Sequence, residues 1–332
     1  MTGERLQNVE TYLPSENVII LTDTNAKKYH RTHFPPGDVI TIGSGEGVKN
    51  LDTVQDIYTG LLELEADRSS FILGIGGGVV CDIAGFVAST YMRGLRFGFV
   101  ASTLLSQVDA SVGGKNGVNF SGYKNMVGVF SQPQFVICDP NLLKTLPLCE
   151  IQCGLAEVVK HAAIADAELF VYLEQNHTRA LALENEVIEK MVHASVVIKS
   201  NIVNSDETER GERRKLNFGH TFGHAIEKIT GLPHGEAISI GMMLAAAVSE
   251  MKGRVTPVAV QRLEALLEKL GLPTRFEIDR PSLLSALRKD KKRNRDKINF
   301  VLLNDIGDAV VEEFDLKELE SDFFERTLTM RT

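Results

Sequence analysis

The sequence lacks the cysteines that a disulfide-stabilised fold requires. It has only four in 332 residues. Cys81, Cys138, Cys149 and Cys153 do not form the CxxC pairs that are typical of a metal knuckle. We therefore expect a protein of the reducing cytoplasm.

Long apolar runs and an excess of positive charge are also missing. The longest apolar stretch, Ile238–Val248, is interrupted by Ser239 and Gly241 and is too short to span a bilayer. Residues 1–5 (MTGER) do not combine a basic start with an apolar run, so no secretory signal is predicted. Thirty-six basic against 44 acidic residues give a net charge of −8, which disfavours general binding to nucleic acid or anionic membranes. An apolar content of 43% with 24% charged residues excludes disordered, collagen-like and coiled-coil classes.

In the first half of the chain, short β-branched runs alternate with glycine turns and helical patterns. This repetition predicts a parallel sheet with helices on its faces. The expected strands are Asn17–Thr22, Asp38–Ile42, Ser70–Ile75, Arg96–Ala101 and Gln134–Cys138, and the expected helices are Leu51–Ala66 and Val79–Ser89.

After Pro147 the pattern becomes helical. The expected helices are Cys149–His177, Thr178–Asn201, Phe218–Thr230, Gly235–Lys252 and Val258–Leu270, and strand-like β-branched runs return only at Ile298–Leu303. We therefore predict two domains, an α/β domain over 1–147 and a mainly α-helical domain over 148–332.

A glycine triplet, Gly76-Gly77-Gly78, follows one predicted strand and opens a helix that contains Asp82. Glycines allow a phosphate to approach the backbone, and the helix N-terminus offers unpaired N–H groups. A tight strand–helix turn without a ligand is the alternative. Asp23 and Asn25 follow an earlier strand, where they could bind a ribose or simply cap a helix.

Two lysines follow glycines nearby, Lys115 in Gly113-Gly114-Lys115 and Lys124 in Gly122-Tyr123-Lys124. Glycines beside a lysine let the ammonium and the nearby amides face an anion. Two solvated loop lysines are the alternative reading.

Three histidines and a glutamate form a candidate metal site. His220 and His224 lie four residues apart and share one helix face, and His234 precedes the next predicted helix. Glu157 lies on an otherwise apolar helix face, where a lone carboxylate is costly unless it is paired or bound to metal. These ligands suit a catalytic Zn²⁺, although the spacing is not the HExxH of zinc proteases. Core or surface histidines remain the alternative.

With these residues in place, the chain resembles the 3-dehydroquinate synthases of the sugar-phosphate cyclase superfamily, from Asp23 to about Gly307. The resemblance rests on the motifs GGGVVCDIAGFVASTYMRG (Gly76–Gly94), STLLSQVDASVGGKNGVN (Ser102–Asn119), GLAEVVKH (Gly154–His161), RKLNFGHTFGHAIE (Arg214–Glu227) and HGEAISIGM (His234–Met242). It implies a Rossmann-like NAD-binding domain, a helical metal-binding domain and a homodimer in which Arg93 reaches the partner's site.

The resemblance also implies roles for individual residues. The metal, Zn or Co, falls to Glu157, His220 and His234, which leaves His224 out of the ligand set. Catalytic roles fall to Asp109, Lys160, Lys199 and His224, and substrate binding to Arg93, Lys115, Asn125, Arg213, Asn217 and Lys291. The NAD-contacting positions are Asp23, Asn25, Glu46, Lys49, Gly77, Gly78, Asp82, Ser102, Thr103, Lys115, Lys124 and Thr145.

The activity implied is conversion of 3-deoxy-arabino-heptulosonate 7-phosphate into 3-dehydroquinate and phosphate, a shikimate-pathway step in which NAD is regenerated. Two features depart from the family pattern. The stretch between His224 and His234 is shorter than in many members, and no glycine follows Asp290-Lys291-Lys292, so Lys292 competes with Lys291 as the phosphate contact.

Three alternatives stay open. One is another sugar-phosphate cyclase, and the second is a metal-dependent polyol or glycerol-phosphate dehydrogenase. The third is a nucleic-acid-binding module built on Arg288–Lys297, which has seven basic residues in ten.

Overall fold

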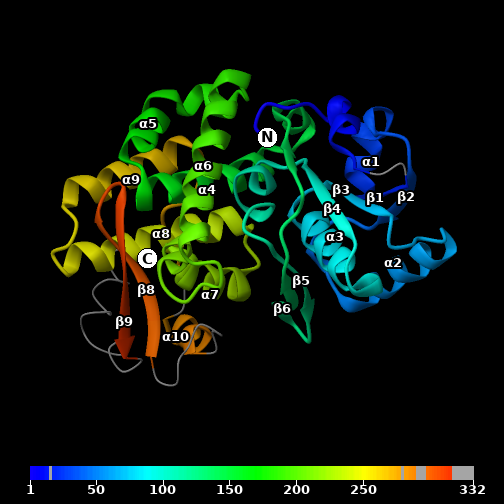
Figure 1. Ribbon diagram of the computed structural model, residues 1–332. Helices are drawn as coiled ribbons and strands as arrows, with labels where there is room; N and C mark the ends of the chain where they lie inside the picture. Colours follow the sequence, from blue (N-terminus) through cyan, green and yellow to red (C-terminus); the bar gives the residue numbers. More distant parts are fainter. Residues whose placement is uncertain (15–16, 278–279, 289–296, 316–332) are drawn as a thin grey trace. The chain divides into compact units, whose positions relative to one another are not determined.

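The computed structural model describes residues 1–14, 17–277, 280–288 and 297–315. Two compact units are present. The first consists of Met1–Glu150 and Ile188–Val196, and the second of Ile151–Val187 with the described part of Val197–Thr332. The first unit thus includes a piece of a later helix. Each unit is described separately below (Figure 1).

The first unit is built on a five-stranded parallel sheet with the order β2-β1-β3-β4-β7. Its strands are β1 (Val18–Asp23), β2 (Asp38–Ile42), β3 (Phe71–Gly76), β4 (Arg96–Ala101) and β7 (Val136–Cys138). Its helices are α1 (Thr24–His30), α2 (Leu51–Glu63) and α3 (Gly78–Thr90). The predicted α/β, Rossmann-like fold of this part is confirmed.

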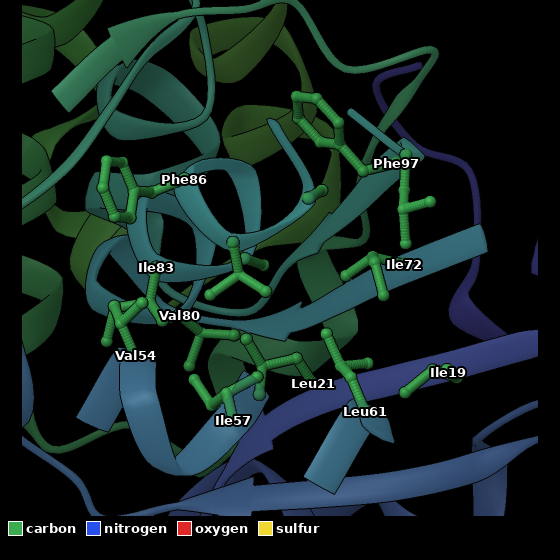
Figure 2. Close-up of a cluster of buried hydrophobic side chains, with 14 of the residues drawn as sticks. Ile19, Leu21, Val54, Ile57, Leu61, Ile72, Val80, Ile83, Phe86 and Phe97 are labelled. Atoms are coloured by element: carbon green, nitrogen blue, oxygen red, sulfur yellow. The ribbon is translucent and has the colours of Figure 1, made fainter. Parts of the chain in front are cut away.

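Side chains of the central strands alternate between two apolar clusters because successive residues of a strand point to opposite faces. In β1, Ile19 and Leu21 join the cluster formed with α2 and α3, whereas Val18 and Ile20 join the cluster on the other face. Figure 2 shows the first cluster, in which Ile57 and Leu61 of α2 lie beside Leu21. The sheet is therefore buried on both sides, as parallel sheets are.

A β-hairpin in the first unit, which contains Lys115 and Lys124, was not among the strands expected from sequence. The hairpin pairs β5 (Lys115–Phe120) with β6 (Tyr123–Phe130) in antiparallel fashion. Ser121 and Gly122 connect the strands with φ of 49° and 77°. Two consecutive positive φ angles are typical of the tight turns that join hairpin strands.

Short 3₁₀ and π-helical elements complete the first unit. They are η1 (Leu6–Tyr12), η2 (Arg31–His33), η3 (Glu46–Val48), η4 (Tyr91–Arg93), the π-helical η5 (Ser106–Ala110) and η6 (Pro140–Thr145).

The second unit is mainly helical, as predicted. Its elements are α4 (Leu148–Ala165), α5 (Ala167–Leu181), α6 (Asn185–Ser205), η7 (Glu212–Asn217), α7 (His220–Thr230), α8 (His234–Met251), α9 (Pro257–Lys269), α10 (Arg280–Arg288) and the hairpin of β8 (Lys297–Asp305) with β9 (Asp308–Asp315). Helix α4 begins in the first unit, and the Ile188–Val196 part of α6 also belongs to that unit. Helix α8 is buried along almost its whole length.

Two of the predicted long helices are wrong in their extent. The helix expected over Cys149–His177 ends at Ala165, because the carboxylate of Asp166 accepts a hydrogen bond from the backbone N–H of Leu169 and caps a new helix. The helix expected over Thr178–Asn201 is likewise divided after α5, where Leu183 has a φ of 55°.

Candidate metal centre and nucleotide site

A fully buried carboxylate forms the centre of the second unit's candidate site. Glu157 of α4 has 0% of its surface exposed and Lys160, one turn later, has 1%. The Lys160 ammonium forms an ion pair with the Glu157 carboxylate. Burying two charges is expensive even when they are paired, so such a pair marks a functional site more readily than a stabilising one.

Two imidazoles from two other helices face this carboxylate. His220 begins α7 after Gly219, whose φ of 77° turns the chain into the helix, and His234 begins α8 after Pro233. The Nε2 atoms of His220 and His234 each lie 3.4 Å from Oε1 of Glu157. The ligand atoms of the three residues lie within 4.8 Å of one another. Two neutral imidazoles and one carboxylate are the donor set that Zn²⁺ or Co²⁺ accepts, so these residues fit a divalent cation.

The second nitrogen of each imidazole also faces an oxygen atom. His220 Nδ1 lies 3.1 Å from the backbone carbonyl oxygen of Phe218, and His234 Nδ1 lies 3.4 Å from Oε2 of Glu227. The ring centroids of the two histidines are 5.6 Å apart. In both rings, then, Nε2 is the nitrogen that faces Glu157.

Burial and charge act against each other at this centre. Burial by itself would raise the pKa of Glu157, but the Lys160 ammonium and the nearby histidines hold that pKa well below its usual value. Burial lowers the pKa of His220. Burial opposes the charge on His234 as well, yet its contacts with Glu157 and Glu227 raise its pKa to about 9. Because a metal binds the neutral imidazole, a cation that binds through His234 below this pKa would displace a proton from it.

His224 lies outside this first group but next to it. Its ring centroid is 5.2 Å from that of His220 and 6.1 Å from that of His234. With Glu227 and His234 it forms a second group whose ligand atoms lie within 4.8 Å. The spacing of His220 and His224 on one helix left open which of them could be a ligand, and the structure brings only His220 to Glu157.

Two more predicted residues of the second unit are buried. Lys199 on α6 is 7% exposed and Arg213 in η7 is 2% exposed. An Nη1–H of Arg213 donates to the carbonyl oxygen of Glu207 at 2.5 Å, and Nδ2–H of Asn217 donates to Oε1 of Glu209 at 2.6 Å. Lys291 lies outside the described residues.

In the first unit, the glycine turn is packed too closely to admit side chains. A Cβ on Gly77 would lie 2.9 Å from Thr103 Cγ2, and one on Gly78 would lie 3.1 Å from Ala110 Cβ. Ser102 N donates to the carbonyl oxygen of Gly76 at 2.8 Å. The carboxyl ends of β3 and β4 therefore meet at the N-terminus of α3, which is where open parallel sheets bind ligands.

Asp23 ends β1 at the same edge of the sheet. Its Oδ1 accepts hydrogen bonds from the backbone N–H groups of Asn25 at 2.7 Å and Ala26 at 2.9 Å. Asp23 is thus the N-cap of α1, as the alternative reading of this turn suggested. Thr145 lies in η6, with its hydroxyl oxygen 3.3 Å from Nε2 of His30.

A buried lysine links the glycine helix to the hairpin. Lys49 is 5% exposed, and its ammonium pairs with the carboxylate of Asp82 on α3. The same ammonium donates to Oδ1 of Asn125 in β6 at 2.5 Å. Nearby, Nδ2–H of Asn119 donates to Oε1 of Glu46 at 2.8 Å. The structure thus brings four predicted ligand-binding residues together, whereas Lys115 and Lys124 are exposed on the hairpin and Asp109 lies in η5.

Arg93 has an unusual backbone. It is exposed, and both Arg93 and the preceding Met92 have left-handed φ angles, of 69° and 49°. Such angles are uncommon outside glycine and indicate local strain.

Glu227 belongs to one of the candidate metal-binding groups but was not among the residues predicted from sequence. The sequence feature that could have identified it is its position one turn after His224 on the same helix, where the two side chains share a face.

The comparisons with known proteins agree along most of the chain. Residues 39–153 match the family model described as 3-dehydroquinate synthase N-terminal, and residues 154–293 match the one described as 3-dehydroquinate synthase C-terminal. The chain is 41% identical over 314 residues to the 3-dehydroquinate synthase of Acetivibrio thermocellus, covering 90% of this chain and 87% of that one.

Solved structures of other cyclases are also similar. A 2-deoxy-scyllo-inosose synthase complexed with carbaglucose-6-phosphate, NAD⁺ and Co²⁺ has a TM-score of 0.88 at 25% identity, over 100% of this chain and 96% of that one. The 2-epi-5-epi-valiolone synthase ValA of Streptomyces hygroscopicus, with NAD⁺ and Zn²⁺ bound, has a TM-score of 0.87 at 26% identity, over 98% and 94%. Among the described residues of this chain, no helix is both long and apolar enough to span a membrane.

Proposed function

The chain belongs to the 3-dehydroquinate synthase family, and from this we propose that it converts 3-deoxy-arabino-heptulosonate 7-phosphate into 3-dehydroquinate and phosphate. This is a phosphorus–oxygen lyase reaction. It uses NAD, which is regenerated in each turnover, and one divalent metal, Zn or Co. The observation that carries the proposal is the buried Glu157 carboxylate with the Nε2 atoms of His220 and His234 each 3.4 Å from it.

The proposed roles of the residues follow from their chemistry. Glu157, His220 and His234 hold the metal. When bound, NAD⁺ takes up and returns a hydride and the metal polarises hydroxyl and carbonyl oxygens of the substrate. The positions proposed to bind NAD are Asp23, Asn25, Glu46, Lys49, Gly77, Gly78, Asp82, Ser102, Thr103, Lys115, Lys124 and Thr145.

The substrate is an anion at both ends, and the proposed clamps match it. Arg213 is suited to the carboxylate because a guanidinium can donate two parallel hydrogen bonds, and Asn217 adds an amide donor. The phosphate is assigned to Arg93, Lys115, Asn125 and Lys291. Holding both ends of one chain brings its reactive carbons together for ring closure, which reduces the entropic cost of that step.

Proton transfers are assigned to Asp109, Lys160, Lys199 and His224. A ketone formed at C5 of the substrate acidifies the neighbouring C–H, so a base can remove that proton and phosphate can leave. Restoration of the hydroxyl, ring opening and an intramolecular aldol closure then produce the carbocycle. An imidazole can both accept and donate a proton, so the side chain of His224 is suited to such transfers.

Two measurements on the purified protein test the function. With NAD⁺ and Zn²⁺ or Co²⁺, it should release phosphate from the heptulosonate phosphate without accumulating NADH. NADH formed in proportion to product would indicate a polyol or glycerol-phosphate dehydrogenase instead. Because the structural relatives include other cyclases at 25–26% identity, glucose 6-phosphate is the necessary second substrate, and its cyclisation in place of the heptulosonate would contradict the proposal.

Two histidine variants test the ligand assignment. His220→Ala should lose bound metal and activity together. His224→Ala, one turn away on the same helix, should lose activity and retain the metal. Loss of metal in His224→Ala would show that the ligand set is wrong.

We also propose a homodimer in which Arg93 completes the partner's site. Arg93→Ala and His220→Ala should each be inactive alone. If Arg93 acts in trans, a mixed dimer contains one site with both residues intact, so random mixing should restore about a quarter of the wild-type activity. If the mixture stays inactive while mixed dimers form, Arg93 acts within its own chain.

A further inference from the structure

The imidazole of His234 lies between two carboxylates. Its Nε2 is 3.4 Å from Oε1 of Glu157, and its Nδ1 is 3.4 Å from Oε2 of Glu227. A neutral imidazole has one N–H and one lone pair, so only one of these nitrogens can bind a metal while the other donates a hydrogen bond.

His220 shows which nitrogen has which role. Its Nδ1 faces the backbone carbonyl oxygen of Phe218 at 3.1 Å, and its Nε2 faces Glu157. A carbonyl oxygen can only accept, so His220 carries its hydrogen on Nδ1 and directs the Nε2 lone pair toward the metal group. An ionised carboxylate is likewise only an acceptor. Glu227 therefore acts on His234 as the Phe218 carbonyl acts on His220.

Close packing of α7 against α8 holds Glu227 in this place. A Cβ on Gly223 would lie 2.6 Å from Cδ1 of Ile238, and one on Gly241 would lie 2.1 Å from the carbonyl oxygen of Gly219. The two helix backbones therefore approach more closely than side chains would permit. Glu227 lies one turn after Gly223, and its side chain is only 16% exposed.

We propose that Glu227 is a positioning residue of the metal centre. Its carboxylate accepts the Nδ1–H of His234, fixes the tautomer that directs Nε2 to the metal, and makes that nitrogen a stronger donor. This inference rests on the proposed metal site at Glu157, His220 and His234. Loss of a carboxylate that supports a metal-binding histidine typically weakens metal binding about 10–100-fold.

The competing interpretation makes Glu227 a direct ligand of a second cation. Glu227, His224 and His234 do form a group with ligand atoms within 4.8 Å. A metal in that group would be bound by Nδ1 of His234. That nitrogen must carry the hydrogen when Nε2 binds a metal at Glu157 and His220. Both metals together would require an imidazolate, which makes a single metal with a supporting carboxylate the simpler arrangement.

The test is the affinity for Zn²⁺, measured by competition with a chromophoric chelator, together with the Zn²⁺ stoichiometry. Glu227→Ala should bind Zn²⁺ about 10–100-fold more weakly than the wild type. Glu227→Gln, whose amide oxygen can still accept the Nδ1–H, should lose less. The matched control is Glu174→Ala, which removes a carboxylate paired with Arg262 at 2.6 Å elsewhere in the unit. It should bind Zn²⁺ as the wild type does.

Each outcome separates the inference from the proposed function. Unchanged affinity in Glu227→Ala and Glu227→Gln would overturn the role of Glu227 while leaving the metal site intact. Two Zn²⁺ per wild-type chain and one per Glu227→Ala chain would overturn it in favour of a second metal. If His220→Ala binds Zn²⁺ as tightly as the wild type does, the proposed metal site and this inference are overturned together. If Glu227→Ala fails to fold, the isosteric Glu227→Gln decides by whether its affinity falls.

Discussion

Replacing Gly235 with alanine is expected to disrupt metal binding from outside the ligand set. Gly235 follows His234 at the start of α8, and its backbone N–H donates to Sγ of Cys153 on α4 at 3.3 Å. A Cβ at this position would lie only 2.4 Å from Cα of Cys153. The obstacle is backbone, which no change of side-chain rotamer can remove.

The size of the effect follows from these distances. Ordinary van der Waals contact begins at 3.4 Å, so the start of α8 must move about 1 Å from α4. Cys153 and Glu157 are one turn apart on α4, so the same movement separates His234 from Glu157. Metal–ligand distances tolerate changes of only about 0.2 Å. We therefore expect Zn²⁺ affinity to fall at least about 100-fold, and overpacking to cost about 1–3 kcal/mol of unfolding free energy.

Chelator competition gives the affinity and urea denaturation gives the stability. The control is Gly98→Ala in β4 of the first unit, where a Cβ would lie 2.8 Å from Cζ of Phe135 in the same unit. It should lower the stability and leave the Zn²⁺ affinity unchanged. The reasoning is refuted if Gly235→Ala binds Zn²⁺ as the wild type does, or if Gly98→Ala weakens binding equally.

Three further predictions concern other parts of the chain. Cys149 is the one exposed cysteine of the four, and burial raises the pKa of Cys138 to about 11. An aromatic disulfide reagent should therefore modify a single thiol rapidly in the native protein. Cys149→Ser should abolish this rapid reaction. Burial lowers the pKa of His30 from 6.5, so the unfolded state binds more protons than the folded state below pH 6.5. The free energy of unfolding should therefore fall as the pH drops below 6.5. His30→Gln should flatten this part of a plot of unfolding free energy against pH. Lys49→Met should remove the cation that pairs with Asp82 and lower the unfolding free energy, measured by urea denaturation, by about 3 kcal/mol. Adding Asp82→Asn should recover part of that loss. Additive losses of the two substitutions would contradict a direct ion pair.

The sheet of the first unit could be predicted because its strands are buried on both faces. Strands such as β1 and β3 read as continuous apolar runs that end in glycine or polar turns. The β6 strand gave no such signal, because almost all of its side chains are exposed or half-exposed and the two-residue alternation is weak. Its turn at Ser121-Gly122 was visible in the sequence, but a glycine beside a lysine also suits an anion-binding loop.

Helix ends were harder to predict than helix positions. Asp166 interrupts an apolar pattern that continues on both sides of it, so periodicity alone does not reveal that its carboxylate starts a new helix. The hydropathy period shows which face of a helix is buried. The position of a helix end depends instead on a local hydrogen bond between the capping side chain and the backbone.

At the metal group, the sequence supplied the residue types and the three-dimensional packing supplied the partners. Helical spacing pairs His220 with His224, but the Glu157 carboxylate is approached by His220 and His234, from the first residues of two different helices. That choice depends on how α4, α7 and α8 pack, and the packing is set by glycines such as Gly235 whose role is invisible in a hydropathy pattern. Glu227 was missed for the same reason, since its partner His234 lies on the neighbouring helix.

Burying basic side chains costs this fold stability. Among the described residues, the buried lysines and arginines are Lys49, Lys160, Lys199 and Arg213. Lysine and arginine are rarely buried unless they are paired, because removing a charge from water is costly. All four are residues that the family resemblance assigns to cofactor, substrate or catalysis. An acidic chain of net charge −8 could satisfy many lysines at its surface at little cost, so burying these four makes sense only if anionic ligands or their carboxylate partners recover the cost. Apolar replacements of matching volume at paired positions, made together with the partner, should therefore stabilise the fold while abolishing activity.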